Sequence, residues 1–218
     1  MNLLHERTET RRRICSKLAK HFVSSLVLTE VQSAMMRAWA ATDGNIKAVL
    51  RAMFTSPAFW YPSIRGSLVK GSFEFAIGLV QRLGHAITLE LVENIAWCLN
   101  QMGQSPFNPP NPAGYATGLR LSAASMLIAR YQYAHYLIYD IDATRVSNRL
   151  TLGLTANLPS DAFITEMARR LGVRNLSTTT RGALNAYLGN KAVTSASLKD
   201  ASLGVLYLLA CSPEYQLS

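Results

Sequence analysis

Residues 88–103, TLELVENIAWCLNQMG, carry the pattern that decides the fold class. Thr88 is a residue type that caps helix N-termini, and Gly103 is the type that ends helices. Between them the apolar side chains recur at helical spacing and form one stripe, which consists of Val92, Ile95, Ala96, Leu99 and Met102. The segment therefore predicts an amphipathic α-helix that packs one face against a core.

The same spacing recurs along most of the chain. It predicts further helices over residues 8–22, 29–41, 45–54, 70–83, 122–139, 160–171, 179–188 and 195–211. Residues 122–139 are apolar nearly all round, which is typical of a central, buried helix. No run of alternating residues competes as a strand. The sequence thus predicts an all-α fold, a compact bundle of about eight to nine helices.

Composition supports one folded helical domain over residues 1–218, with a division near residue 143 as the alternative. Hydrophobic residues make up 49% of the chain and charged residues only 16%, against about 25% charged in an average domain. No apolar stretch reaches the roughly 20 residues that a membrane span needs. No apolar segment follows the basic residues at the N-terminus, so the chain as encoded lacks a secretory signal and is expected in the cytoplasm.

Basic residues concentrate at the two ends of the chain, which has a formal net charge of +9. Residues 1–70 carry a net charge of +7, residues 71–142 of −2 and residues 143–218 of +4. Arg11, Arg12 and Arg13 fall on the polar face of the first predicted helix. This face is either a nucleic-acid or acidic-lipid patch or a solvated helix face. We favour the solvated face, because the aromatic residues that usually accompany nucleic-acid binding are missing there.

The sequence contains no motif for metal binding, cofactor binding or catalysis. Cys15, Cys98 and Cys211 are far apart and lie in apolar helical contexts, which indicates buried thiols. The four histidines lack the spacing of a zinc site. Nucleophile elbows and phosphate-binding loops are absent as well. We therefore expect no metal and no cofactor, we name no catalytic residue, and we favour a function other than catalysis.

A proline-rich loop interrupts the helices at residues 105–114, SPFNPPNPAG. Because proline lacks an amide donor and fixes φ, Pro109 and Pro110 predict an extended loop of polyproline II type, which ends at Gly114. Loops of this kind next to aromatic residues often form contact surfaces.

Two helix ends share one pattern, LRAMFTSPAFW at residues 50–60 and LYLLACSPEYQ at residues 206–216. In each, a Ser-Pro pair ends the helix, at Ser56-Pro57 and at Ser212-Pro213. We expect the aromatic residues that follow, Phe59 and Trp60 in the first case, to fold back over the last helical turn.

Two groups of residues are candidates for ligand binding. Gln104, Tyr115 and Arg130 could form an anion pocket with the 105–115 loop, since a guanidinium group binds sulfates and carboxylates. The alternative for Arg130, which we favour, is an internal arginine that donates to loop carbonyls. His135 shares a helix face with Tyr131 and Tyr139, so it either lines a pocket or, as we favour, is a core histidine bonded by a tyrosine hydroxyl.

Six segments, in order, resemble those of the bacterial domain-of-unknown-function family 1800 (DUF1800). They are CSKLAKHFV (15–23), LRAMFTSPAFW (50–60), KGSFEFAIGLVQRLG (70–84), MGQSPFNPPNPAGY (102–115), ARYQYA (129–134) and LLACSPEYQ (208–216). The segment at 102–115 is the most specific, although Tyr115 replaces the usual tryptophan. The resemblance is vaguest over residues 143–205.

The resemblance implies a mostly helical fold and no established activity. Family members are about twice this length, so the chain resembles their C-terminal half. A missing N-terminal half and a neighbouring sulfatase-like protein are the implied partners, and an exported, periplasmic location is implied for a full-length member. We therefore predict a structural or partner-interaction module. A ligand-binding or hydrolytic protein with an anion pocket at Gln104 and Arg130 is the alternative, and nucleic-acid binding by the N-terminal helix is the least favoured function.

Overall fold

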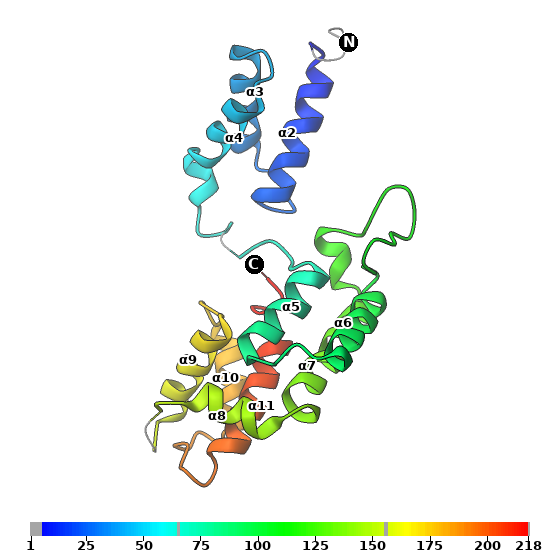
Figure 1. Cartoon of the computed structure of the whole chain (residues 1–218). Coiled ribbons are helices and arrows are strands. Elements are labelled where there is room, and N and C mark those ends of the chain that lie inside the picture. Colours follow the sequence, from blue (N-terminus) through cyan, green and yellow to red (C-terminus); the bar gives the residue numbers. More distant parts are fainter. Residues whose placement is uncertain (1–5, 65, 155–156, 218) are drawn as a thin grey trace. The chain divides into compact units, whose positions relative to one another are not determined.

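The computed structural model describes residues 6–64, 66–154 and 157–217, and over these ranges the chain is all-α (Figure 1). The ten α-helices are α2 (Thr8–Phe22), α3 (Thr29–Ala41), α4 (Ile46–Phe54), α5 (Ser72–Leu83), α6 (Leu89–Gln101), α7 (Ala124–His135), α8 (Ala143–Thr151), α9 (Ser160–Leu171), α10 (Thr178–Tyr187) and α11 (Leu198–Cys211). Two 3-10 turns, η1 (Pro57–Trp60) and η2 (Gly118–Ser122), and a π-helical turn, η3 (Tyr136–Asp140), complete the described elements.

The contacts divide the chain into two compact units, with the boundary between Val69 and Lys70. The first unit contains α2 to α4, and the second, Lys70–Leu217, contains α5 to α11. The sequence favoured one domain, with an alternative division near residue 143. At that point the chain instead enters α8, which packs against α11 within the second unit. Apolar contacts between distant helices therefore place the division, and local composition does not reveal it.

The first unit is a small three-helix body with its own core. Its helices begin as the sequence indicates, and the Asn45 side chain caps α4 by accepting from the Ala48 N–H at 3.2 Å. Cys15 is fully buried, as expected for a structural thiol. The core consists of Cys15, Ala19, Val23, Val31, Met35, Trp39, Val49, Met53 and Ala58.

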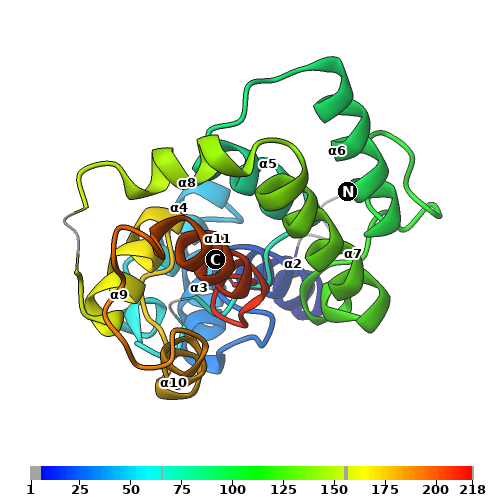
Figure 2. The same ribbon diagram turned by 90° about the horizontal axis from the view of Figure 1, so that it is seen from below.

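The central helix of the second unit is α11. Figure 2 shows it with α7, α8 and α9 around it, and each of these helices packs against it. Buried residues follow one another through α11 from Ala201 to Leu206 and again at Leu209 and Ala210. The sequence predicted that 122–139 would be the central buried helix, and this is corrected: Ile128 in α7 is 55% exposed. That segment also divides into η2, α7 and η3.

The buried face of α6 agrees only in part with the sequence expectation: of the predicted stripe, Ile95, Leu99 and Met102 are buried, whereas Val92 and Ala96 are exposed. In α6 the core receives Leu91, Ile95, Cys98 and Leu99, whereas Val92 is 46% exposed. The apolar side chains of this helix cover a wider arc than its buried face, so periodicity alone does not select the part that packs against α5 and α7. No helix among the described residues is both long and apolar enough to cross a bilayer.

Candidate functional site

Arg130 is wholly buried in the second unit, and it joins two distant segments. Its Nη1 donates to Oε1 of Gln216 at 2.8 Å, and its Nη2 donates to the carbonyl of Lys70 at 2.7 Å. The guanidinium carbon lies 5.1 Å from the centre of the Phe75 ring. Burial disfavours the charged form and lowers the pKa of Arg130. These contacts are those of an internal arginine that donates to backbone and side-chain carbonyl groups.

Gln104 ties the start of α5 to the chain beyond the proline-rich loop. Its Oε1 accepts from the Ser72 N–H at 2.8 Å, and its Nε2 donates to the carbonyl of Ala116 at 3.0 Å. Both polar ends of this buried amide are therefore used within the protein. Tyr115 supports the same loop from its other end, because its hydroxyl donates to the carbonyl of Ser105.

Lys70 lies between these groups and the C-terminal segment. Its N–H donates to the carbonyl of Gln216 at 2.8 Å, and its Nζ donates to the carbonyl of Tyr215 at 2.7 Å and lies 3.8 Å from the Tyr215 ring centre. Burial, together with the nearby charges of Arg130 and Arg82, lowers the pKa of Lys70 to about 8, although Glu74 opposes the shift. A lysine with this pKa is largely but not completely protonated at neutral pH.

We call Lys70, Ser72, Gln104, Arg130 and Gln216 the Lys70 hub. Its members come from four of the segments that carry the family resemblance, and tertiary packing brings them together. Because their polar atoms mostly bond within the protein, the hub resembles a brace that fixes α5, α7 and the C-terminal segment. An anion pocket at Gln104 and Arg130 stays a prediction, and the contacts favour the alternative of an internal arginine.

The two Ser-Pro ends share their backbone geometry but use their aromatic residues differently. After α4, the Phe59 N–H donates to the Ser56 carbonyl at 3.0 Å, and Trp60 Nε1 reaches back to the Phe54 carbonyl at 3.1 Å. After α11, the Tyr215 N–H donates to the Ser212 carbonyl at 3.2 Å. Its ring packs on Phe75, at 5.8 Å between ring centres. Pro57 and Pro213 end their helices as the sequence predicted.

The proline-rich loop consists of turns, and it is not a continuous polyproline segment. The Asn108 N–H donates to the Ser105 carbonyl at 3.2 Å, and the Gly114 N–H donates to the Asn111 carbonyl at 3.0 Å. Pro109 and Pro110 lie exposed between these turns, and Gly114 takes a φ of 90°. Because local hydrogen bonds organise the loop, it presents a defined outline to the solvent.

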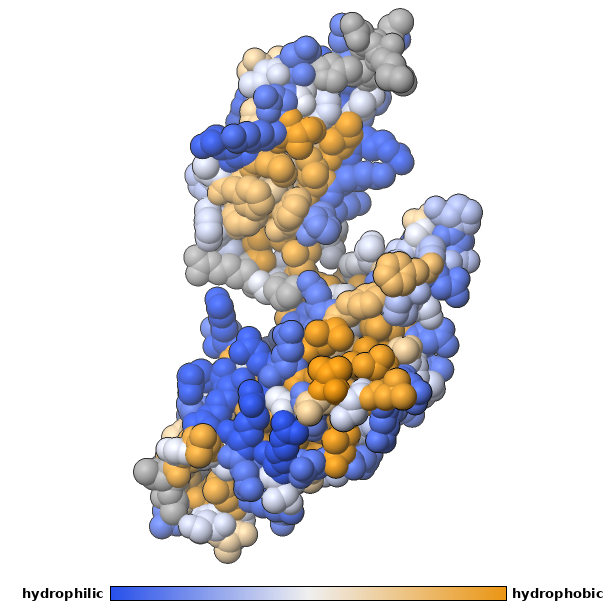
Figure 3. All heavy atoms as spheres, viewed as in Figure 1, coloured by the Kyte–Doolittle hydropathy of each residue, from blue (hydrophilic) through white to orange (hydrophobic). Residues whose placement is uncertain are grey.

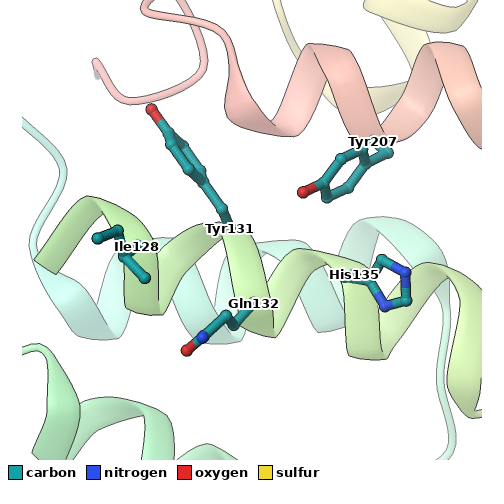
Figure 4. Close-up of a pocket in the computed structure, with 5 residues that line it drawn as sticks. All are labelled: Ile128, Tyr131, Gln132, His135 and Tyr207. Atoms are coloured by element: carbon teal, nitrogen blue, oxygen red, sulfur yellow. The ribbon is translucent and has the colours of Figure 1, made fainter. Parts of the chain in front are cut away.

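His135 lines a hollow between α7 and α11 (Figure 4). The hollow has a volume of about 430 Å³ and is lined by Ile128, Tyr131, Gln132, His135 and Tyr207. The His135 side chain is 53% exposed, and its Nδ1 lies 3.3 Å from Oδ2 of the equally exposed Asp140. The pair is open to water, where such an ion pair contributes little. Of the two sequence interpretations, the pocket-lining histidine agrees with this position, and the core histidine does not.

A second hollow lies on the other side of α7, toward α6. It has a volume of about 400 Å³ and is lined by Asn94, Trp97, Gln132, Tyr133 and Tyr136. The Asn94 amide donates to the Tyr136 hydroxyl at 2.9 Å, which fixes one wall. The buried Tyr133 hydroxyl has no hydrogen-bond partner among the described residues. Sequence reasoning missed Trp97 and Gln132, because nothing in the α6 or α7 pattern marks them apart from neighbouring surface residues.

The surface beside this hollow is apolar. Ile87, just before α6, and Leu89, its first residue, are 69% and 75% exposed, and Val92 and Trp97 are exposed farther along the helix. Figure 3 shows hydrophobic residues gathered over the region of α5 and α6. We call Ile87, Leu89, Val92 and Trp97 the α6 surface. A group of large exposed apolar side chains is a common mark of a protein contact site.

The remaining candidate groups are ordinary helix surface. Arg12 and Arg13 are exposed on α2, on the polar face that the sequence predicted. Among the described residues, no three His, Cys, Asp or Glu side chains come together as a metal site would require.

Comparison with known proteins gives one match. A family model described as a protein of unknown function (DUF1800) matches residues 1–217. No curated protein and no solved structure matches the chain.

Proposed function

The chain belongs to the DUF1800 family, whose function is unknown, and on this premise we propose that it is a helical module that binds a protein partner through the α6 surface. One observation carries the proposal: four large apolar side chains, one just before α6 and three on it, are exposed to water. Burial of these side chains against a partner is favourable, by about 25 cal/mol of free energy for each Å² of apolar area removed from water.

The hollow beside α6 adds a place for an anchoring side chain. Partners bind most tightly where a side chain fills a preformed pocket near the centre of an interface. Trp97 belongs both to the α6 surface and to the 400 Å³ hollow, so it joins the two features. The hollow also contains the amides of Asn94 and Gln132, which can orient a polar group of the partner.

The negative charge of this region indicates which residues a complementary partner presents. Glu90 and Glu93 lie on α6 among the exposed apolar residues, and residues 71–142 carry a net charge of −2. A complementary partner presents apolar side chains with basic residues at their edge. The sulfatase-like protein encoded beside family members is the partner that the resemblance names, and it is the one that we propose.

The test compares binding by two kinds of serine variant. Leu89→Ser with Val92→Ser removes apolar area from the α6 surface, and both side chains are exposed, so the fold should tolerate the change. Leu152→Ser is the matched control, because Leu152 is 77% exposed in the same unit but lies after α8. Binding of the purified sulfatase-like protein is measured by isothermal titration calorimetry.

We expect micromolar or tighter binding by the unchanged chain and the control, and at least a tenfold loss in the double variant, equivalent to about 1.4 kcal/mol. An absence of binding by the unchanged chain at 100 µM would overturn the proposal. A dissociation constant of this size corresponds to a binding free energy on the order of 5 kcal/mol. An equal loss in the control would overturn the assignment of the surface.

A further inference from the structure

The ends of three helices in the second unit are linked by arginines in a closed cycle. From α8, Arg145 Nη2 donates to the carbonyl of Gly84, the residue that ends α5, at 2.6 Å. From α9, Arg170 Nη1 donates to the carbonyls of Leu150 and Leu152 at the end of α8, at 2.9 Å each. The C-terminal ends of α5 and α8 thus each accept hydrogen bonds from an arginine of another helix.

The cycle closes through two glycines that arginines approach closely. Gly172 ends α9, and a Cβ placed on it would lie 3.0 Å from Nη2 of Arg82, on α5. A Cβ on Gly84 would coincide with the guanidinium group of Arg149, from α8. Both glycines have positive φ, 73° at Gly84 and 90° at Gly172. The absence of a side chain therefore permits the left-handed backbone and also leaves room for the guanidinium group.

The positive charge gathered here exceeds what the helix ends can neutralise. Each C-terminus supplies about half a negative charge, whereas Arg82, Arg145, Arg149 and Arg170 bring four guanidinium groups. The carboxylate of Glu166 is shared between Arg169 and Arg170, at 2.6 Å from each. Among the described residues, no carboxylate makes an ion pair with Arg82, Arg145 or Arg149.

This surface differs from a solvated charged face in its residue type. All of its cations are arginines, whose planar forks bind phosphate and sulfate oxygens in pairs, whereas lysine acts as a point charge. Arg82, Arg145 and Arg149 are exposed, and Figure 3 shows hydrophilic residues gathered over α8 and α9. The Gly84 carbonyl holds the Arg145 guanidinium in place, and Arg82 and Arg149 lie against the glycines that end α9 and α5, so a ligand finds one of the three groups already positioned.

We propose that Arg82, Arg145 and Arg149 form a binding site for a ligand that carries two or more phosphate or sulfate groups. The site is independent of the α6 surface and of the protein partner proposed above. A single phosphate would meet only part of the surface, so affinity should rise with the number of anionic groups. Because the contacts are charged and exposed, binding should weaken as salt is added.

The probe is tripolyphosphate, titrated into the full chain by calorimetry at low salt, with a sulfated disaccharide as a second arm. Arg82→Gln with Arg149→Gln removes two charges that make no hydrogen bond to another described residue. Arg12→Gln with Arg13→Gln removes the same charge from the exposed face of α2. Circular dichroism melts show whether each variant folds. If the glutamine variant does not fold, Arg82→Lys with Arg149→Lys replaces it, because lysine preserves the positive charge.

We expect tripolyphosphate to bind the unchanged chain and the α2 variant alike, and to bind the Arg82/Arg149 glutamine variant at least tenfold more weakly. The lysine variant should lie between them. Tighter binding in one arm identifies phosphate or sulfate as the preferred group. Absence of binding at 5 mM in both arms, equal loss in both glutamine variants, or binding of a DNA duplex without binding of either small probe would overturn the proposal.

Discussion

Arg130 and Gln216 are 86 residues apart in the sequence, and a 2.8 Å hydrogen bond joins their side chains inside the second unit. Gln216 also uses its Nε2 to donate to the Ala210 carbonyl at 2.7 Å, so both ends of its amide are bonded. The bond therefore ties α7 to the turn that follows α11. Its environment is dry, which makes the loss of either partner costly.

Replacement of Arg130 should destabilise the second unit strongly. Arg130→Ala leaves the Lys70 carbonyl and the Gln216 amide oxygen without their donor and opens a cavity, so we expect a loss of about 3–5 kcal/mol in the free energy of unfolding. Arg130→Lys should lose less, because one of the two bonds can persist. Urea unfolding followed by circular dichroism measures both. Arg120→Ala, at an exposed position, is the control and should stay within about 0.5 kcal/mol. An Arg130→Ala protein as stable as the control would contradict the bracing role.

Because the pKa of Lys70 is lowered, we expect the free energy of unfolding to depend on pH in the alkaline range. The folded protein releases this proton near pH 8, whereas the unfolded chain retains it to about pH 10.4. Between these values the unfolded state binds more protons, so this group makes folding more favourable as the pH rises. Buried tyrosines and cysteines have raised pKa values and act in the opposite direction, so the comparison must be with Lys70→Met. We expect the stability of the unchanged chain to increase relative to Lys70→Met from pH 8 to pH 10 in urea titrations. A constant difference would show that the Lys70 pKa is not lowered.

Two glycines of α5 should respond in opposite ways to alanine. Gly84→Ala forces a side chain onto a positive φ and against Arg149, and we expect a loss of about 1–3 kcal/mol. Gly78→Ala lies inside the helix with open space around the new methyl group, and should gain about 0.5–1 kcal/mol. Thermal melts measure both variants. In the Gly84→Ala/Arg149→Ala protein the steric part of the cost should disappear, and full additivity of the two changes would refute the contact.

Glu214 should stabilise the start of α10 above pH 4.5 and lose that effect in acid. Burial raises the pKa of Glu214, but hydrogen bonds from Ser177 and Thr180 outweigh it and lower the pKa. The Ser177 N–H donates to Oε1 at 3.0 Å, and the Thr180 hydroxyl donates at 2.9 Å. Because the folded pKa lies below the unfolded one, the stabilisation is present above about pH 4.5 and is lost as the pH falls. Glu214→Gln should cost about 1 kcal/mol at pH 7 and little at pH 3. Glu93→Gln is the exposed control. If the cost of Glu214→Gln does not change with pH, the charge of the Glu214 carboxylate is not the source of the stabilisation.

The positions of helix ends could be predicted from the sequence, because they depend on neighbours within a few residues. The Thr88 side chain accepts from the Leu91 N–H at 3.2 Å, and Ser-Pro ends both α4 and α11. One helix was missed: α8 carries only Val146 and Leu150 as a buried apolar pair, too few for periodicity to detect. Its signal was Asp142, whose side chain accepts from the Arg145 N–H at 2.9 Å.

By itself, the sequence determined the all-α class, the family and most helix boundaries, since helical periodicity and capping are local properties of the chain. Only the tertiary structure decided which part of the apolar arc of α6 is buried, because the neighbouring helices cover Leu91 and Cys98 and leave Val92 exposed. The same holds for Arg130: its partners lie 60 and 86 residues away. No pattern within one helix indicates that Lys70 and Gln216 would meet it there, because their meeting depends on how α5, α7 and α11 pack.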